Sequence, residues 1–562
     1  MKKLIFKRSI IFKSSLIMIT SSVIIAAPLS VIACEIKNEI TIRPINWYSP
    51  VNTINGTDDA FANDSCSILW DEEKKLFYSW MLFRNGKGFP SGWIEMTSPD
   101  LNTWTQGEYR IQLNKDFSTL NGKGNTSALG GSVWVDTQGK FFDKGDVVFV
   151  LSMQPSRILN PKKEEIGSKK SSSSSNTTDE SGIAYFVSHG LGEEFYTSGV
   201  LSKECLNKDG SMNWRDTAVF ETDNGLYFAI SANNRLEFWR INHFGNKSTN
   251  TGEKITKVNE LFVRNIGVEV PNVVRLDENL WYVSASVQDN PFGGPFQSSW
   301  WTFCEWDETK GFIPVERNEN GEFEEIENIR TVEAALAIQK EQPKNKVINW
   351  EEAQEEEYRN MINPWIVNEY GTEGYAQRVV NPYQTQDTIK WKSSKKSNEN
   401  KYKPESLIAR SMTSNWAYKT DIWSWKGGSY GSEKITFTED WKAVFEPNDL
   451  IGEYSNNGTA VYNLKGEDLV NGYNLIFNDQ NFTFYLEDNK ISWQNNIKTR
   501  LKKWTNSGGP ADSNDEIIIV WNQCTLTFYN KTKAWNAHFM LPSNTKHTVN
   551  ENAKSIVAGN TV

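Results

Sequence analysis

The sequence is poor in the residues that bind transition metals. Its 562 residues include only 4 His and 5 Cys, and neither set contains the closely spaced pairs that zinc sites use. A transition-metal enzyme is therefore not expected, and we predict no cofactor. Apart from Cys34, the cysteines are too far apart for a disulfide scaffold, and we expect most of them to be buried thiols: Cys66, Cys205, Cys304 and Cys524.

An excess of positive charge is also missing. The chain has 60 Lys and Arg against 70 Asp and Glu, a net charge of −10. Proteins that bind nucleic acid usually carry a basic face, so nucleic acid is not an expected partner. With 38% hydrophobic and 23% charged residues, the composition excludes a fibrous or wholly disordered protein, and the length suits two or three domains at about 100 to 200 residues each.

Only the amino terminus contains a long uncharged stretch. Four basic residues lie within the first eight, and residues 14–33 are apolar or small, a pattern typical of an export signal. The stretch ends in Val31-Ile32-Ala33-Cys34, which resembles the lipobox of bacterial lipoproteins, whose Cys becomes the lipidated first residue. We therefore expect a signal peptide at 1–33, a lipid anchor at Cys34 followed by a tether at 34–44, and a location on the outer face of the cell membrane. An ordinary secretory signal and an uncleaved anchor are the alternatives.

Aromatic residues are abundant, at 13% of the chain, which suits packed β-structure and also sugar binding through stacked rings. Short β-branched and aromatic runs such as Leu226–Ile230 alternate with Asn, Asp and Gly turns, which predicts an all-β sandwich, barrel or propeller. Two stretches interrupt this pattern. Residues 162–181 are a polar, serine-rich loop, and residues 317–361 are predicted to be an acidic, partly helical insertion. Strands resume beyond residue 438.

Three short acidic motifs occur in a specific order. Asp64 follows Asn63, Asp216 follows Arg215, and Glu269 precedes Val270-Pro271-Asn272. In this order they resemble the Asn-Asp-Pro, Arg-Asp-Pro and Glu-Cys-Pro motifs of glycoside hydrolase family 32, the β-fructosidases. Further stretches resemble that family at the corresponding places: Ser98-Pro99-Asp100-Leu101-Asn102-Thr103-Trp104, Gly131-Ser132-Val133, Ile183-Ala184-Tyr185, Glu369-Tyr370-Gly371 and Ser414-Asn415-Trp416-Ala417-Tyr418.

The resemblance extends over about residues 45 to 425 and implies a fold. The family's catalytic domain is a five-bladed β-propeller, so we expect one at residues 45–437, including the insertion at 317–361. A weaker similarity to the family's carboxy-terminal β-sandwich predicts that domain at residues 438–562. In such a propeller the three acids begin successive blades, and we expect them to face one axial pocket.

The resemblance also implies a reaction. Retaining glycosidases use one carboxylate as nucleophile and one carboxylic acid as proton donor, about 5 to 5.5 Å apart. By resemblance Asp64 is the nucleophile, Glu269 is the general acid and base, and Asp216 binds fructosyl hydroxyls. We expect the pKa of Glu269 to be raised by a neighbouring ionised Asp64. The expected substrate is sucrose or a β-fructan, and the expected substrate-binding residues are Asn63, Arg215, Trp93, Ser132 and Trp416.

Each motif departs from the family at one position. Ser65 and Thr217 stand where the family has Pro, and Val270 stands where it has Cys. Because the acids persist while their neighbours differ, we expect hydrolysis with altered substrate contacts. Two rival functions stay open: a fructosyltransferase of the same propeller type, and a sugar-binding lipoprotein that has lost activity. Taken singly, Asp64 also fits an Asx turn, Arg215-Asp216 an ion pair, and Glu269 a solvated strand end.

The lipid anchor can be tested directly. If Cys34 is lipidated, the wild-type protein should sediment with membranes, whereas the Cys34→Ser protein should be released or should keep its signal peptide. Immunoblots of membrane and medium fractions measure both outcomes. A wild-type protein found entirely in the medium would contradict the anchor.

Overall fold

The computed structural model describes the part of the chain from Phe61 to Thr548, with internal gaps. Several predicted features lie outside the described residues: the export signal, Cys34, the loop expected at 162–181, most of the insertion expected at 317–361, and Trp416. The described residues are 61–84, 92–99, 101, 104–111, 126–155, 182–202, 214–232, 234–248, 250–263, 267–287, 298–326, 365–371, 374–381, 407–413, 428–429, 433–438, 441–447, 460–470, 473–477, 480–487, 490–495, 511–522, 525–540 and 547–548.

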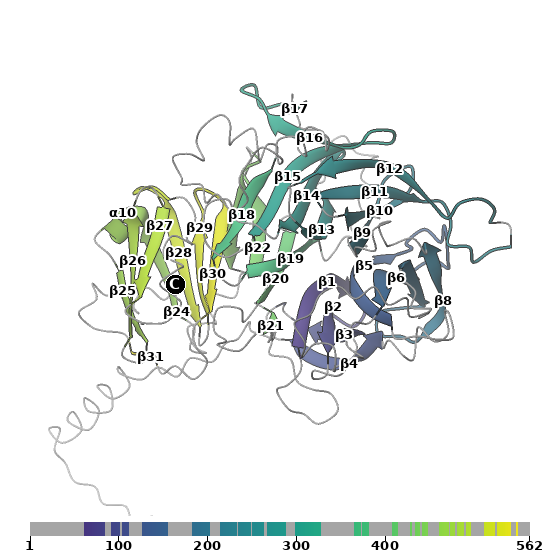
Figure 1. Cartoon of the computed structure of the whole chain (residues 1–562), viewed down its shortest axis with the longest axis horizontal. Coiled ribbons are helices and arrows are strands. Elements are labelled where there is room, and N and C mark those ends of the chain that lie inside the picture. The colour runs from purple at the N-terminus through teal and green to yellow at the C-terminus, as the bar shows by residue number, and fades with distance from the viewer. Residues whose placement is uncertain are drawn as a thin grey trace, which may run out of the picture.

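The first twelve strands form three antiparallel sheets of four strands each (Figure 1). Within each sheet the strands pair in chain order, so each sheet is a meander. The first contains β1 (Phe61–Asp71), β2 (Leu76–Arg84), β3 (Gly92–Ser98) and β4 (Thr105–Ile111). The second contains β5 (Thr126–Val135), β6 (Val147–Pro155), β7 (Gly182–Ser188) and β8 (Phe195–Ser202). The third contains β9 (Trp214–Glu221), β10 (Leu226–Ala232), β11 (Arg235–Ile241) and β12 (Ile255–Phe262).

The fourth and fifth sheets continue this arrangement. The fourth runs from β13 through β14, β15 and β18 to the carboxy-terminal strands β30, β29, β28 and β24; β16 pairs with β15, and β17 pairs with β16. Its first strands are β13 (Val268–Arg275), β14 (Leu280–Val287), β15 (Ser298–Asp307), β16 (Gly311–Arg317), β17 (Phe323–Glu325) and β18 (Ile366–Gly371). The fifth contains β19 (Gly374–Val380), β20 (Leu407–Thr413), β21 (Gly428–Ser429), β22 (Glu433–Phe437) and β23 (Ala443–Pro447).

The carboxy-terminal strands gather at one end of the molecule, away from β1–β12 (Figure 1). They form the outer part of the fourth sheet and a separate sheet in the order β27-β26-β25-β31. The elements are β24 (Ala460–Lys465), α10 (Gly466–Val470), β25 (Tyr473–Phe477), β26 (Gln480–Glu487), β27 (Lys490–Asn495), β28 (Glu516–Asn522), β29 (Thr525–Asn530), β30 (Trp535–Met540) and β31 (His547–Thr548). The all-β class expected from the sequence is confirmed, and the four-stranded sheets are compatible with a propeller.

Hydrophobic content differs between central and edge strands in the way that burial requires. All seven residues of β10 are buried, and its sequence Leu-Tyr-Phe-Ala-Ile-Ser-Ala contains no charge. In β12, which ends the same sheet, exposed or half-exposed residues predominate, and two of them, Lys257 and Glu260, are charged. A strand covered on both faces needs a continuous apolar run, whereas an edge strand that faces water does not. None of the helices in the described part has the length and apolar character of a membrane span.

The first strands of the five sheets are tied to one another by bonds between a side chain and the backbone. The ties join β1 to β5, β5 to β9, β9 to β13, β13 to β19, and β19 back to β1. The bonds are Val133 N to Ser67 Oγ (3.0 Å), Val219 N to Ser132 Oγ (2.7 Å), Val270 N to Asp216 Oδ2 (3.2 Å), Val379 N to Asn272 Oδ1 (3.0 Å) and Arg378 Nε to the Ser65 carbonyl (3.1 Å).

Each of these five strands also has an irregular pairing with its neighbour. The register shifts lie beside Ser65 in β1, Gly131 in β5, Asp216 in β9, Pro271 in β13 and Arg378 in β19. At three of them a non-glycine residue has left-handed backbone angles, with φ of 61° at Asp216, 49° at Val270 and 54° at Ala376. A bulge leaves backbone groups without ladder partners and redirects side chains. In all five strands, backbone groups and side chains beside these shifts are therefore free to bond across to another sheet or to form a site.

Two of the five cysteines lie among the described residues. Cys66 and Cys304 are free and buried, as expected from their spacing. Burial raises the pKa of the Cys66 thiol far above its ordinary value, so the sulfur stays protonated and behaves as a small apolar group. The other three cysteines lie outside the described residues.

Candidate active site

Asp64 lies in β1 at the first irregular pairing and is only 8% exposed. The thiol of Cys66 donates a weak hydrogen bond to the Asp64 carbonyl, with the sulfur 3.7 Å from the oxygen. Asn63 precedes Asp64 in the same strand, but its side chain is outside the described part of the structure. A carboxyl group this deeply buried is costly unless other charges or hydrogen bonds compensate it.

Asp216 lies in β9 and is 1% exposed. Its backbone N–H donates to Ser152 Oγ at 3.0 Å, and its Oδ2 accepts from the Val270 N–H at 3.2 Å. Gly130 in β5 makes room for the carboxylate, because a methyl group at residue 130 would lie 2.5 Å from Asp216 Oδ1. Residues of two other strands, Gly130 of β5 and Val270 of β13, therefore fix the position of this carboxylate.

The other carboxylate oxygen of Asp216, Oδ1, is buried without a hydrogen-bond donor among the described residues. An unsatisfied buried acceptor costs about 1 to 3 kcal/mol. Such a group is suited to receive a hydroxyl from a bound ligand, which would remove that cost.

Glu269 lies in β13 and is 6% exposed. Its carboxylate forms an ion pair with the guanidinium of Arg215, so Arg215 pairs with the acid of the next sheet. The side chain of Arg215 is 31% exposed, and its carbonyl accepts a bond of 2.6 Å from Ser231 Oγ. Arg215 is therefore the more exposed partner of this ion pair.

Shared charges and bonds link the three acids: Arg215 acts electrostatically on Asp64 and forms an ion pair with Glu269. Burial and the nearby negative charge of Asp216 raise the pKa of Asp64 to about 7, while Arg215 and Arg378 act in the lowering direction. Asp216 in turn accepts the N–H of the residue after Glu269. The structure thus brings together Asp64, Asp216, Glu269 and Arg215 from three different sheets. The raised pKa that the structure shows is that of Asp64; the raised pKa expected for Glu269 from the sequence stays a prediction.

The other candidate residues lie in the packed interior or outside the described part. Trp93 is fully buried, and its indole N–H donates to the Leu129 carbonyl at 3.0 Å. Ser132 is buried and accepts the Val219 N–H, so its hydroxyl ties β5 to β9. Trp416 and Cys34 are not among the described residues. A sugar-binding role for Trp93, Ser132 and Trp416 stays a prediction.

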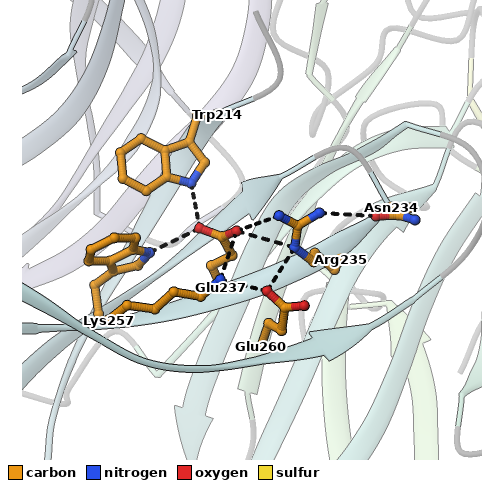
Figure 2. Close-up of polar contacts among 7 residues, drawn as sticks. Trp214, Asn234, Arg235, Glu237, Lys257 and Glu260 are labelled. Carbon is orange, nitrogen blue, oxygen red and sulfur yellow. Dashed lines mark hydrogen bonds and ion pairs between the residues drawn. The ribbon is translucent and has the colours of Figure 1, made fainter. Parts of the chain in front are cut away.

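Next to Arg215, a network of charged and aromatic residues fixes Trp214 (Figure 2). The carboxylate of Glu237 accepts the indole N–H groups of Trp214 at 2.9 Å and Trp239 at 3.2 Å. Arg235 and Lys257 also bind Glu237, at 2.7 and 3.1 Å. Burial alone would raise the pKa of Glu237, but these two cations, Lys257 foremost, bring it below its ordinary value. The half-buried Trp214 ring is thus held rigidly beside the site.

A comparison with known protein families places this segment of the chain in one of them. The family model described as "Glycosyl hydrolases family 32 N-terminal domain" matches residues 57–369, more than half of the chain. The chain belongs to glycosyl hydrolase family 32. The protein is accordingly a glycosidase, and Asp64, Asp216 and Glu269 all lie within the matched segment. None of the curated protein sequences matches this chain.

Solved structures of family 32 enzymes have a similar fold. The exo-inulinase from Aspergillus awamori superposes with a TM-score of 0.58 and 12% sequence identity, over 91% of this chain and 95% of that chain. The β-fructofuranosidase from Schwanniomyces occidentalis in complex with fructosyl-erythritol gives 0.56 and 11%, over 91% and 93%. The sucrose-6-phosphate hydrolase from Lactobacillus gasseri gives 0.52 and 10%, over 91% and 89%. At such low identity these similarities show the fold alone.

Three functional features were not found in the sequence. They are the close approach of Gly130 to Asp216, the clamp of Glu237 on Trp214, and the buried Arg378, which acts on Asp64. The only signals available were a Gly-Gly pair at 130–131 and an arginine directly before two valines. Neither signal distinguishes a functional position from an ordinary turn or edge strand.

The burial of Asp64 predicts that this site reduces stability at neutral pH. The pKa of Asp64 rises from its ordinary 3.8 to about 7 on folding. Between these values the folded protein binds more protons than the unfolded chain, so stability falls as pH rises through this window. Asp64→Asn mimics the protonated form. It should raise the free energy of unfolding at pH 8 by a few kcal/mol, at about 1.36 kcal/mol per pKa unit.

Thermal unfolding at two pH values checks this. The Tm of Asp64→Asn should exceed that of the wild type by several °C at pH 8, and the two should nearly coincide at pH 4. Glu319→Gln removes one negative charge at an exposed position and serves as the control, with no comparable pH-dependent gain. An Asp64→Asn protein that is less stable than the wild type at pH 8 would contradict the burial argument.

Proposed function

We propose that this glycosidase is a retaining enzyme that releases fructose from sucrose or a β-fructan through a fructosyl-enzyme intermediate. The observation that carries the proposal is the convergence of Asp64, Asp216 and Glu269 from three sheets, each in the motif that resembles the family's own. A pure binding protein has no need to bury three carboxylates together, because each one costs free energy that sugar binding does not require.

The proposed chemistry assigns one role to each acid. The ionised Asp64 attacks the anomeric carbon of the fructosyl unit, and Glu269 gives its proton to the glycosidic oxygen as that bond breaks. Glu269 then takes a proton from water, whose oxygen attacks the same carbon and releases Asp64. The unpaired Oδ1 of Asp216 accepts a fructosyl hydroxyl, an interaction that strengthens as positive charge develops on the ring.

The ion pair between Arg215 and Glu269 has a consequence for this sequence of steps. A guanidinium against a carboxylate favours the charged form, whereas an acid catalyst must hold a proton. Arg215 therefore has to move away from Glu269 when substrate enters. Its partial exposure leaves it free to turn toward the sugar, which fits the substrate-binding role expected from the sequence.

The proposed architecture is a five-bladed propeller at residues 45–437 followed by a β-sandwich at 438–562. Five sheets whose first strands are tied in the cyclic order β1, β5, β9, β13, β19 support the blade count. The sheet of β24, β28, β29 and β30 together with the sheet of β25, β26, β27 and β31 supports the sandwich. In this arrangement the acids begin the first, third and fourth blades. The expectation of three successive blades is wrong, because the sheet of β5 to β8 lies between those of Asp64 and Asp216.

The choice of substrate rests on similarity. The structures with a similar fold are described as an exo-inulinase, a β-fructofuranosidase and a sucrose-6-phosphate hydrolase. A fructosyl unit is the group shared by the substrates of such enzymes, so we propose it for this protein. With the lipid anchor at Cys34, the enzyme would act on sugars at the outer face of the cell membrane.

The division of roles can be tested with two variants and two substrates. Asp64→Asn removes the nucleophile and should reduce the hydrolysis of both sucrose and an activated aryl fructoside by at least about 10⁴-fold. Glu269→Gln removes the proton donor, which an activated leaving group hardly needs. It should therefore lose far more activity on sucrose than on the aryl fructoside.

Product analysis on sucrose, inulin and levan completes the test. Free fructose from any of the three supports hydrolysis, whereas longer fructans formed at high sucrose would indicate a transferase. Tight binding of fructans without cleavage would support the rival binding function. Asp64→Asn with wild-type turnover would show that the proposed mechanism is wrong even though the family assignment stands.

A further inference from the structure

Arg378 is a buried cation that the proposed chemistry does not use. It lies in β19, is 2% exposed and belongs to none of the motifs found in the sequence. Within the described part of the chain its guanidinium binds three backbone carbonyls and pairs with no carboxylate. A charged group is rarely buried without an ion-pair partner, so this arrangement calls for a function.

The three carbonyls belong to the strands that form the site. Nε of Arg378 donates to Ser65 at 3.1 Å, Nη1 to Pro271 at 2.8 Å and Nη2 to Gly131 at 2.9 Å. Ser65 directly follows Asp64, and Pro271 is two residues after Glu269. Gly131 follows Gly130, the glycine against the carboxylate of Asp216. One rigid side chain therefore spans the strand positions next to all three acids.

The backbone irregularities explain why these carbonyls are available. All three lie at the register shifts of β1, β5 and β13, and Arg378 itself lies at the shift of β19. A bulge leaves carbonyl groups without their ladder partners, and buried carbonyls without partners are costly. A guanidinium offers several donors in a fixed planar fork that can satisfy three of them at once.

We propose that Arg378 is the positioning residue of the active site: its guanidinium fixes the spacing of the strands that carry Asp64 and Glu269, and it supplies the buried positive charge that offsets the acids. This inference rests on the proposed function. Arg378 does not touch the reacting atoms in this scheme; it acts through the acids.

The charges around Asp64 decide what the loss of Arg378 would change. Asp216 from β9 raises the pKa of Asp64, and Arg215 from β9 and Arg378 from β19 lower it; burial raises it most. Glu269 from β13 forms an ion pair with Arg215, one of these two cations, and the Cys66 thiol of β1 stays neutral. Because Arg378 is one of two cations among the described residues that lower the pKa of Asp64, its removal should make Asp64 harder to ionise.

Two substitutions separate spacing from charge. Arg378→Gln removes the charge, so the acidic limb of the pH profile of kcat/KM on sucrose should move to higher pH by roughly 1 unit. Arg378→Lys keeps the charge but loses the fork, so kcat should fall by about 10²-fold while the limb stays at the wild-type pH. Arg275→Gln is the control. Arg275 also donates to backbone carbonyls, those of Asp277 and Glu278, and neither of these two residues is next to an acid of the site in the sequence. Both parameters should therefore keep their wild-type values in this variant.

An infrared titration makes the test independent of catalysis. The carbonyl stretch of the protonated Asp64 carboxyl, identified by its absence from Asp64→Asn, should persist to higher pH in Arg378→Gln than in the wild type. If no fructoside is cleaved but this shift occurs, the proposed function fails and the role of Arg378 on Asp64 stands. A folded Arg378→Gln protein with the wild-type titration would overturn the proposal. If Arg378→Gln does not fold, Arg378→Lys decides, and wild-type kcat in that variant would overturn it.

Discussion

The structure depends on burying three carboxylates at one place without leaving their charges uncompensated. Like charges in a medium of low polarity repel strongly, and each also loses its hydration. The effect is seen at Asp64, where burial and the charge of Asp216 raise the pKa to about 7. Arg215 and Arg378 oppose this from two different strands; the side chain of Arg215 is 31% exposed, whereas Arg378 is buried. The positions of both arginines follow from this electrostatic constraint.

Irregularities in the backbone supply the groups that hold the three buried carboxylates and Arg378 in place. Regular strands would use their N–H and C=O groups in ladders, but the first strand of each of the five sheets has a register shift at the level of the acids. Left-handed angles at Asp216 and Val270 cost free energy in non-glycine residues and persist because the surroundings hold them. The contacts of Asp216 with the Val270 N–H and of Arg378 with three carbonyls are the bonds that hold them.

The sequence predicted what depends on local pattern and missed what depends on distant partners. Short aromatic and β-branched runs predicted the all-β class, and the order of motifs identified three acids that the structure brings to common partners. Pairing across sheets was not predictable: the neighbour of Arg215 in sequence is Asp216, but its ion-pair partner is Glu269. Trp93 shares its residue type with sugar-stacking platforms, yet its side chain is fully buried. Arg378 gave no signal because its partners are backbone groups more than a hundred residues away.

The stereochemistry of the first product tests the central claim most directly, because the retaining mechanism requires Asp64 to form a covalent bond with the fructosyl carbon. Rapid NMR spectra during hydrolysis of a β-fructoside distinguish the two anomers before mutarotation mixes them. The account predicts that β-fructofuranose appears first. Initial release of the α-anomer would mean that water attacks directly, and would contradict the role of Asp64 as nucleophile.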